Sequence, residues 1–470
     1  MTQKNHHKNV ETREDFLISS QERYTLSDRW IVRNDPNFHT HYLAFNIDSG
    51  DKYKISGTIF IILKLLENNC LTIEQVCNYL REKGLKLQAA EIIKLLKKDL
   101  GTSDVLKKSE NVLSPLVKRH QTFIKSDVPV TSTPYEAEVH FTNACNLKCR
   151  HCVYDAGRKI PNQLEAESWF KIFDQFESLE TFRVIISGGE PLVYPGAKDI
   201  IRYLTSKRIR IELLTNGTLI DESLAVILSS PNFSTTVSLD GADDKTHDML
   251  RGQGCFDRVV KGLKFLSQSG ACFHIAATVH KRNLHQLKDL VEIAIRLGAK
   301  SINFILLDPL GRAKHQDDLL LEPSEISNIS NAAKRLASAY GDSIYVGYLD
   351  PSIPEYKDLD ITKGNSKIFC TAGTTRIAIR SDGIVFPCVY AFHDNKFAMG
   401  SARLQNIEDI WISESWKLFR GSIELQNLNE CKNCSLSEAC TLKICRLRAY
   451  FNEGDFFGKP PGCQNALMQH

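Results

Sequence analysis

The chain has 470 residues, of which 42% are hydrophobic and 24% are charged, and this composition excludes collagen-like, low-complexity and wholly disordered proteins. Its 59 Lys and Arg against 56 Asp and Glu leave a formal charge of +3, so bulk charge predicts neither nucleic acid nor a membrane surface as a partner. At roughly 150 residues per domain, the length allows about three domains.

The start of the chain is polar, and residues 1–21 are predicted to be a disordered tail. No apolar segment of a secretory signal is present there. The longest apolar stretch, Ile59 to Leu66, is short and contains Lys64, so no membrane span is predicted. We therefore expect a cytoplasmic protein, in which the 14 cysteines are metal ligands or catalytic thiols rather than disulfides.

Residues 22–104 are predicted to form a winged helix-turn-helix domain. A hairpin is expected over 42–55, with its turn at Asp48-Ser49-Gly50. Three helices follow, over 58–67, from a capping box at Thr72 and Gln75 to just before Gly84, and over 88–100. Residues 105–134 have weak periodicity and are predicted to be a linker.

From Tyr135 the pattern changes to strands that alternate with amphipathic helices. Strands are predicted over 136–141, 182–186, 209–214, 233–239, 273–279 and 301–307. Six such βα units predict an α/β fold, a partial (β/α)6 barrel over 135–335, whose chemistry lies at the loops that follow the strands.

The cysteines fall into two informative groups. Cys145, Cys149 and Cys152 lie in the loop after the first predicted strand, and seven more lie between Cys370 and Cys463. Zinc sites usually have four ligands, whereas three thiolates on a four-iron cluster leave one iron open to a small molecule. Residues 336–470 are irregular and rich in cysteine, so we predict a metal-dependent domain there. The isolated cysteines, at 70, 77, 255 and 272, are interpreted as small buried hydrophobic residues.

Four motifs follow the first four predicted strands in order. They are Cys145-x3-Cys149-x2-Cys152, Gly188-Gly189-Glu190-Pro191, Thr215-Asn216-Gly217 and Ser238-Leu239-Asp240-Gly241. Together with Arg251-Gly252 and residues 309–313, they resemble the radical S-adenosylmethionine (SAM) enzymes over about residues 135–312.

This resemblance implies roles for individual residues. The three cysteines of the first motif would bind a 4Fe–4S cluster whose open iron binds SAM. Gly188 and Gly189 let the backbone approach the amino group of SAM, and Glu190 supports that group. Ser238 and Asp240 correspond to residues that bind the ribose or methionine part, and Arg251 corresponds to a carboxylate partner. His151 is expected near the adenine. The sequence identifies no radical-quenching side chain.

The seven C-terminal cysteines resemble those of the SPASM domain, an extension of these enzymes that carries auxiliary clusters. By resemblance, one 4Fe–4S cluster is fully ligated by Cys431, Cys434, Cys440 and Cys463. A second, held by Cys370, Cys388 and Cys445, keeps a vacant iron, which brings the total to three clusters. One departure is that four residues, rather than three, separate Cys440 from Cys445.

Residues 22–104 also resemble the precursor-peptide recognition element of enzymes that modify ribosomally made peptides. The leader of such a peptide would pair with the hairpin edge and lay apolar side chains against the third helix. The alternative is a DNA-binding winged helix. Residues 42–101 contain nine Lys and Arg against seven Asp and Glu, a weak charge for contact with phosphates, so we expect no nucleic acid partner.

These resemblances together predict a peptide maturase, an oxidoreductase that forms thioether links of the sactipeptide or ranthipeptide type. Its expected partners are a cysteine-containing precursor peptide and a flavodoxin- or ferredoxin-type electron donor. Carbon–carbon crosslinking, epimerisation and formylglycine formation of the anaerobic sulfatase-maturase type remain alternatives. A cluster-bearing DNA-binding regulator is a non-enzymatic alternative, but it leaves Gly188, Gly189, Glu190 and Arg251 without a role.

Overall fold

The computed structural model describes residues 18, 21–34, 42–100, 105–109, 124, 126, 128–349, 367–368, 370–421, 423–434, 444–460 and 463. The chain divides into two compact units, residues 1–121 and residues 122–470, which are treated separately below. Of the predicted disordered tail, all but Ile18 and Gln21 lies outside the described residues, as does Cys440. None of the helices in the described parts of the chain has the length and apolar character that crossing a membrane requires.

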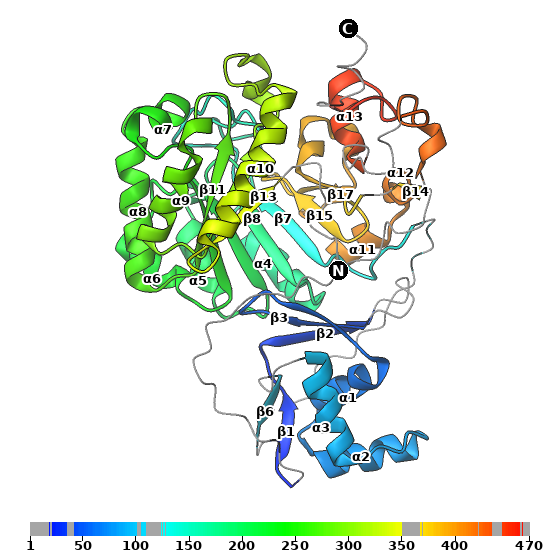
Figure 1. Ribbon diagram of the computed structural model, residues 1–470. Coiled ribbons are helices and arrows are strands. Elements are labelled where there is room, and N and C mark those ends of the chain that lie inside the picture. The colour runs from blue at the N-terminus through cyan, green and yellow to red at the C-terminus, as the bar shows by residue number, and fades with distance from the viewer. Residues whose placement is uncertain are drawn as a thin grey trace. The chain divides into compact units, whose positions relative to one another are not determined.

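The N-terminal unit contains the predicted hairpin and the three predicted helices. They are β3 (Tyr42–Asn46), β4 (Lys52–Ile55), α1 (Gly57–Asn68), α2 (Ile73–Glu82) and α3 (Ala89–Leu100) (Figure 1). The hairpin turn is set by Asn46, whose side-chain oxygen accepts hydrogen bonds from the Asp48 and Ser49 N–H groups. The predicted capping box is confirmed: Thr72 accepts from the Gln75 N–H, and the Gln75 side chain accepts from the Thr72 N–H.

Four strands of this unit were not predicted. They are β1 (Arg23–Leu26), β2 (Trp30–Asn34), β5 (Leu71–Thr72) and β6 (Leu106–Lys108). Strand β2 pairs with β3, so the predicted wing belongs to a three-stranded sheet, β2-β3-β4. Four of the five β2 residues are buried, so the strand lacks the alternation of apolar and polar residues by which a half-exposed strand is predicted from sequence. Strand β6 pairs with β1, so the predicted linker, 105–134, begins with a strand.

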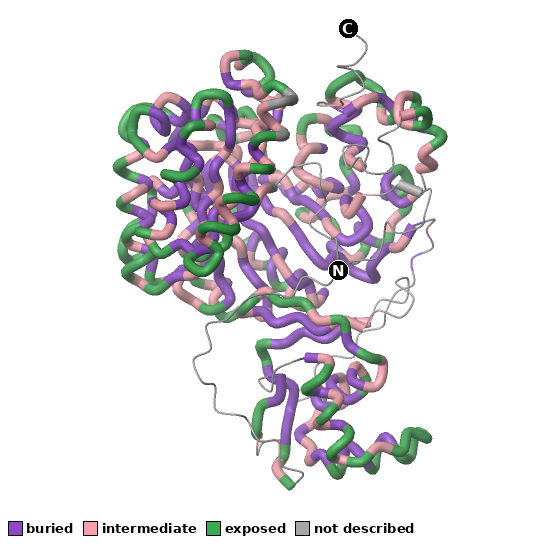
Figure 2. The backbone as a smooth tube through the Cα atoms, in the orientation of Figure 1, coloured by how far each residue is buried: buried purple, intermediate pink, exposed green. Residues whose placement is uncertain are grey.

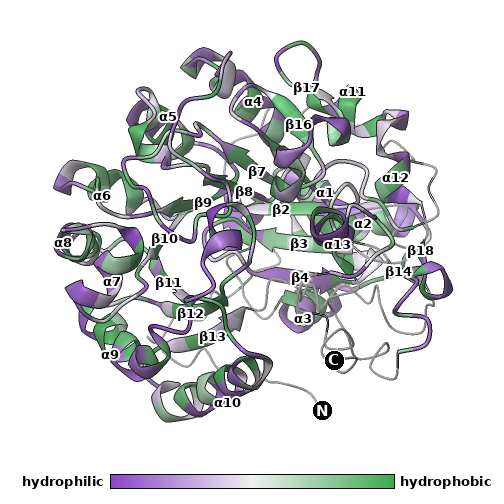
Figure 3. Ribbon diagram, turned by 90° about the horizontal axis from the view of Figure 1, so that it is seen from above, coloured by the Kyte–Doolittle hydropathy of each residue, from purple (hydrophilic) through white to green (hydrophobic). Residues whose placement is uncertain are grey.

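The C-terminal unit is built on a ten-stranded sheet in which all six predicted strands are present. They are β7 (Glu136–His140), β8 (Arg183–Ser187), β9 (Arg210–Thr215), β10 (Phe233–Ser238), β11 (Phe273–Val279) and β12 (Ser301–Leu306). Each of these strands is parallel to its neighbours in this order. Viewed from above, they follow one another around an arc (Figure 3).

The helices of this unit cover the outer face of the arc. They are α4 (Ala166–Ser178), α5 (Ala197–Leu204), α6 (Glu222–Leu228), α7 (Asp244–Arg251), α8 (Cys255–Ser269), α9 (Leu287–Leu297) and α10 (Pro323–Tyr340). Alternate residues of β11 are buried, because one face of the strand packs against helices. Figure 2 shows the strands buried and the outward sides of the helices exposed. The predicted α/β class is thereby confirmed.

The sheet extends beyond the six predicted strands on both edges. Strand β13 (Tyr345–Leu349) continues it beyond β12, so the domain boundary predicted at 335/336 falls inside α10. On the other edge, β15 (Arg376–Ile379) runs parallel to β7, followed by β16 (Ile384–Phe386) and β17 (Gly400–Ser401). Glu136 pairs with Arg183 at 2.6 Å and also with Arg376, which ties β15 to β7 and β8.

The remaining C-terminal elements are short. They are β14 (Lys367–Ile368), β18 (Ile423–Glu424), α11 (Ile407–Ile412), α12 (Lys417–Arg420) and α13 (Arg446–Glu453). Two buried tryptophans, Trp411 and Trp416, pack in the same apolar core as the barrel helices. The barrel and the cysteine-rich region therefore share one core.

Candidate functional site

The three cysteines of the first motif converge in the loop that follows β7, residues 141–157, which we call the cysteine loop. Cys145, Cys149 and Cys152 pack together with Leu147 and with Cys255 from the start of α8. Burial is the main cause that raises the pKa of Cys145 to about 11, and the nearby Glu190, Cys149 and Cys152 contribute to this rise. The predicted trio therefore gathers at one position at the carboxyl end of β7, where Cys149 is buried and Cys145 and Cys152 are partly buried.

Gly188 and Gly189 hold the cysteine loop by backbone contact. A Cβ atom on Gly189 would lie 2.1 Å from the Ala144 carbonyl oxygen, and Gly188 has φ +131°. The Gly189 N–H donates to the Thr142 carbonyl at 2.8 Å, and the Glu190 N–H donates to the Ala144 carbonyl at 2.9 Å. The cysteine loop itself thus requires both glycines, a reason that the sequence motif did not reveal.

The segment after β12 holds the same loop from another direction. The Arg312 side chain donates a hydrogen bond through Nε to the Cys149 carbonyl at 2.8 Å. The backbone N–H of Arg312 donates to the Cys152 carbonyl at 3.0 Å. Gly311 has φ +56°, and a Cβ there would lie 2.4 Å from the Cys152 carbonyl oxygen. Sequence analysis placed residues 309–313 within the matching region but missed this contact.

Glu190 connects the ends of β8 and β9. Its buried carboxylate accepts hydrogen bonds from the Thr215 hydroxyl at 2.7 Å and from the Asn216 N–H at 2.8 Å. Burial raises the pKa of Glu190, and these hydrogen bonds partly offset the effect. Asn216 in turn donates to Asn146 at 2.9 Å, so the third motif also contacts the cysteine loop.

Asp240 and Arg251 form a buried ion pair. Arg251 Nε lies 2.5 Å from Asp240 Oδ2, and the other carboxylate oxygen accepts from the Thr278 N–H at 2.8 Å. Burial alone would raise the pKa of Asp240, but Arg251 and His151 hold it below its ordinary value. His151 Nε2 lies 3.4 Å from Arg251 Nη2. Ser238 is half-buried at the end of β10, two residues before Asp240.

The donor set fits an iron–sulfur cluster and SAM. Burial raises the pKa of Cys149, and the positive charges of Arg251 and Arg312 oppose that rise, as they would also stabilise an anionic cluster. Buried nitrogens without a hydrogen-bond partner among the described residues include His151 Nδ1 and His247 Nε2. No three His, Cys, Asp or Glu side chains of the described ranges are placed to hold a single metal ion. A four-iron cluster instead binds each thiolate through a different iron.

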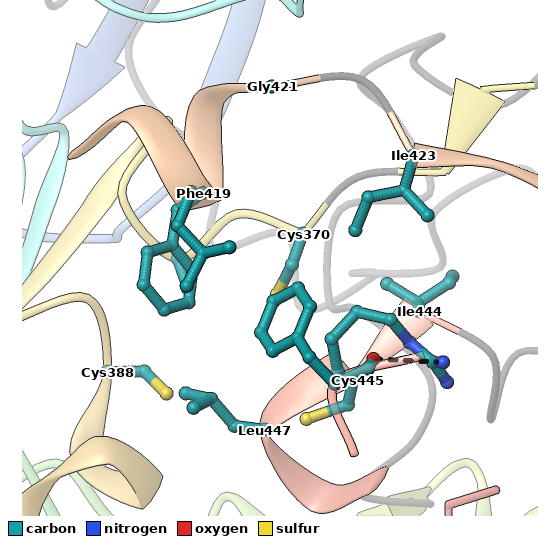
Figure 4. Close-up of a pocket in the computed structure, with 12 residues that line it drawn as sticks. Cys370, Cys388, Phe419, Gly421, Ile423, Ile444, Cys445 and Leu447 are labelled. Atoms are coloured by element: carbon teal, nitrogen blue, oxygen red, sulfur yellow. Dashed lines mark hydrogen bonds between the residues drawn. The ribbon is translucent and has the colours of Figure 1, made fainter. Parts of the chain in front are cut away.

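Three of the predicted auxiliary ligands line one cavity. Cys370, Cys388 and Cys445 share it with apolar side chains that include Phe419 and Leu447. Figure 4 shows the three sulfur atoms directed toward this common space. Burial, together with the nearby Cys370 thiol, raises the pKa of Cys445 to about 12. Burial and the neighbouring Cys445 and Cys370 thiols also raise the pKa of Cys388. Cys445 therefore joins the group despite the extra residue before it.

The other predicted auxiliary ligands are described only in part. Cys431 and Cys434 lie in one turn, where the Cys434 N–H donates to the Cys431 carbonyl at 3.2 Å. Cys463 is described, but the residues directly before and after it are not, and Cys440 lies outside the described residues. The grouping of these four thiols therefore stays a prediction.

A buried polar group links the barrel to the auxiliary cysteines. Asp308, in the loop after β12, accepts a hydrogen bond from the Tyr390 hydroxyl at 2.7 Å and pairs with Arg448 at 3.3 Å. Tyr390 and Arg448 follow Cys388 and Cys445 by two and three residues. Sequence analysis missed this contact because it joins segments that are far apart in the chain.

Comparison with known proteins gives matches over both cysteine groups. Residues 139–294 match the family model of the radical SAM superfamily, and residues 370–435 match that of SPASM, an iron–sulfur cluster-binding domain. An AdoMet-dependent heme synthase of Methanosarcina barkeri is 29% identical over 354 residues, which cover 72% of this chain and 98% of that protein.

Two further relatives are named for the maturation of mycofactocin and the biosynthesis of the bacteriocin subtilosin. Mycofactocin maturase MftC of Mycobacterium ulcerans is 30% identical over 333 residues, or 68% of this chain and 85% of that protein. The antilisterial bacteriocin subtilosin biosynthesis protein AlbA of Bacillus subtilis is 29% identical over 286 residues, or 60% of each chain. Among solved structures, Streptococcus suis SuiB bound to the precursor peptide SuiA has a TM-score of 0.71 at 18% identity, covering 93% of this chain and 99% of that one.

Proposed function

Because the chain belongs to the radical SAM superfamily and carries a SPASM domain, we propose that this enzyme installs thioether crosslinks in a ribosomally made peptide. In this proposal a cysteine sulfur of the peptide is joined to a carbon of another residue. SAM and iron–sulfur clusters are the cofactors of such an enzyme, and our proposal includes three 4Fe–4S clusters. A flavodoxin- or ferredoxin-type protein would supply the electron.

The grouping of Cys370, Cys388 and Cys445 around one cavity carries this proposal. Three thiolates leave one iron of a four-iron cluster available, and a substrate thiolate is a suitable fourth ligand. A peptide cysteine held there would be fixed close to the barrel, because Asp308 of the barrel contacts the residues that follow Cys388 and Cys445. Carbon–carbon crosslinking and epimerisation give no role to a docked sulfur.

The relatives support a peptide substrate. MftC is named a maturase of mycofactocin, AlbA belongs to subtilosin biosynthesis, and SuiB was solved with a precursor peptide. The heme synthase match shows that the shared barrel also serves other substrates, so the barrel alone does not select a peptide. The N-terminal unit is the part that we assign to peptide recognition.

The residues of the barrel orient the reactants in this proposal. When bound, the reduced cluster and SAM supply a 5′-deoxyadenosyl radical that takes a hydrogen atom from carbon. Arg312, Gly188 and Gly189 hold the cysteine loop in place through their backbone contacts. Arg251 and Asp240 form a buried ion pair and would offer their charges to the polar groups of SAM. These contacts would hold the cluster and SAM in a fixed orientation relative to the peptide.

The leader of the peptide would bind the N-terminal unit by strand addition. Strands β2 and β4 form the two edges of the sheet β2-β3-β4, and a peptide strand can pair with either edge. Helix α3 has three lysines, at 94, 97 and 98, which suit acidic leader residues. The winged-helix character predicted for residues 22–104 remains part of this proposal.

Mass spectrometry of the peptide tests the proposal. The anaerobic enzyme is incubated with SAM, a reductant and a candidate precursor peptide that contains cysteine. We expect the loss of two hydrogens per crosslink, located at a cysteine. An unchanged mass with an inverted residue would instead indicate epimerisation, and loss of sulfur would indicate formylglycine formation.

Variants of the auxiliary cysteines separate the thioether proposal from general radical chemistry. Cys388→Ala and Cys445→Ala should still release 5′-deoxyadenosine but form no crosslink, with Cys272→Ala as the control outside the cavity. Crosslinking at the wild-type rate in both cavity variants would contradict the proposed docking of the thiolate.

A further inference from the structure

A second cavity lies beside the cysteine loop. Its volume is about 430 Å³, within the usual range for a ligand site, and its lining includes His140, Tyr154, Phe392 and His393. His140 ends β7, and Tyr154 follows Cys152 by two residues. Phe392 and His393 follow Cys388 by four and five residues. The cavity therefore joins the segment that carries the first cysteine group to the segment that carries an auxiliary cysteine.

His140 is a buried polar group that the contacts described so far do not use. Its side chain is 5% exposed and lies near two rings, with the His140 ring centroid 4.7 Å from that of Tyr154 and 4.8 Å from that of Phe392. Its Nε2 atom is buried and has no hydrogen-bond partner within the described part of the chain. A buried nitrogen left in this state costs about 1–3 kcal/mol unless a ligand meets it.

Glu138 lies beside this nitrogen. Its carboxylate oxygen is 3.5 Å from His140 Nε2, and both residues are on β7, two positions apart, so both side chains point to the same face of the strand. Ala137 and Val139, which alternate with them, pack in the core against the helices. Glu138 and His140 therefore face the inside of the arc, where a substrate would lie.

Thioether formation requires a proton acceptor. The acceptor carbon loses a hydrogen atom to the 5′-deoxyadenosyl radical, and the substrate thiol loses a proton. The carbon–sulfur bond then forms between the carbon radical and the thiolate, and one electron passes to an iron–sulfur cluster. The atoms and electrons balance only if a base takes the thiol proton.

We propose that this cavity binds the cysteine-bearing segment of the peptide and that the His140 imidazole accepts the proton of the substrate thiol before the sulfur docks in the cavity of Cys370, Cys388 and Cys445. Glu138 stabilises the resulting imidazolium by its negative charge. The inference rests on the proposed thioether chemistry. The charged or titratable groups that share the cavity or flank His140 are Glu138, Tyr154, Arg380, Asp382 and His393. Arg380 already pairs with Asp382 at 2.8 Å, so these two charges offset each other.

The first test compares His140→Gln with the wild type and with His285→Gln, an exposed histidine outside the cavity. The ratio of crosslinked peptide to released 5′-deoxyadenosine is measured for each protein. We expect His140→Gln to lower this ratio about 100-fold, the lower end of the range for a lost general base, while 5′-deoxyadenosine release continues.

The second test needs no turnover. Diethyl pyrocarbonate labels unprotonated imidazoles, and the labelled histidines are identified by mass spectrometry, with SAM present and reductant omitted. We expect the cysteine-containing precursor peptide to protect His140 from labelling and to leave His285 labelled as before. This measurement uses the wild type, so it stands even if His140→Gln does not fold.

The outcomes separate the two proposals. Equal crosslinking by His140→Gln and wild type, equal labelling of His140 with and without peptide, or no labelling of His140 in the free enzyme would each overturn the inference. If the wild type leaves the peptide mass unchanged, the proposed function fails instead, and the labelling result still decides whether the cavity binds the peptide.

Discussion

His247 shows how a single buried side chain makes the site sensitive to pH. Its Nδ1 accepts a hydrogen bond from the Asp240 N–H at 3.1 Å, so the neutral ring carries its proton on Nε2. Burial, followed by the positive charge of Arg251, lowers the pKa of His247 from 6.5 to about 4. Protonation of Nδ1 would place its N–H opposite the Asp240 N–H, and this unfavourable contact of two donors agrees with the lowered pKa of His247.

We predict that His247 makes the folded protein less stable in mild acid. Above pH 6.5 the ring is neutral in both states, whereas between pH 6.5 and pH 4 only the unfolded chain takes up the proton. Stability is therefore lost as the pH falls through this window. His247→Asn should reduce the loss between about pH 7.5 and about pH 5 by about 2 kcal/mol, measured by anaerobic urea unfolding.

The control for this prediction is His285→Asn, because His285 is exposed. Its stability should depend on pH as the wild type does. An unchanged acid sensitivity in His247→Asn would show that the folded state does not keep His247 neutral.

The cysteine loop is the element on which the site depends most directly. Gly189→Ala would place a Cβ 2.1 Å from the Ala144 carbonyl, which is backbone and cannot swing aside. Gly157, in the same loop, has no heavy atom within 4 Å of an added Cβ and is the matched control. We predict that Gly189→Ala loses about four of about twelve irons per chain, while Gly157→Ala keeps all of them, as measured by iron analysis. Equal iron content in both variants would contradict the assigned contact.

The elements that the sequence predicted well are those with local signals. The capping box at Thr72 and Gln75 and the six strands of the barrel were read from neighbouring residues, and so was the order of the motifs at the strand ends. Strand β15 was missed because its partner, β7, lies about 240 residues earlier in the chain, a pairing that periodicity does not reveal.

The same distinction holds for the site. The spacing of Cys145, Cys149 and Cys152 is enough to bring them together in one loop, and the structure does so. The surroundings of His140, by contrast, include a ring contact with Phe392, a residue of the auxiliary-cysteine region about 250 positions later in the chain. A lone histidine at the end of a strand carries no sequence signal of that contact.

Across the whole molecule, the two units have separate hydrophobic cores. One core is formed within the N-terminal unit around Trp30, Ile59 and Ile92, and the other lies within the C-terminal unit. Separate cores allow one unit to fold without the other. The residues around the cysteine loop and the auxiliary-cysteine cavity all belong to residues 122–470.

Removal of residues 1–121 should therefore separate recognition from chemistry. The shortened chain should release 5′-deoxyadenosine at the full-length rate but modify the precursor peptide at least about 10-fold more slowly at low peptide concentration, because tethering by the leader is lost. A high concentration of peptide should restore part of the rate. Undiminished modification at low concentration would rule out the proposed recognition role.

The central claim is that the cysteine loop holds the cluster that cleaves SAM. Its most direct test is the release of 5′-deoxyadenosine, measured by chromatography after anaerobic incubation of the full chain with SAM and reductant. The wild type should release it, Cys272→Ala should match the wild type, and Cys149→Ala should release none. Release by Cys149→Ala at the wild-type rate would contradict the assignment of this loop.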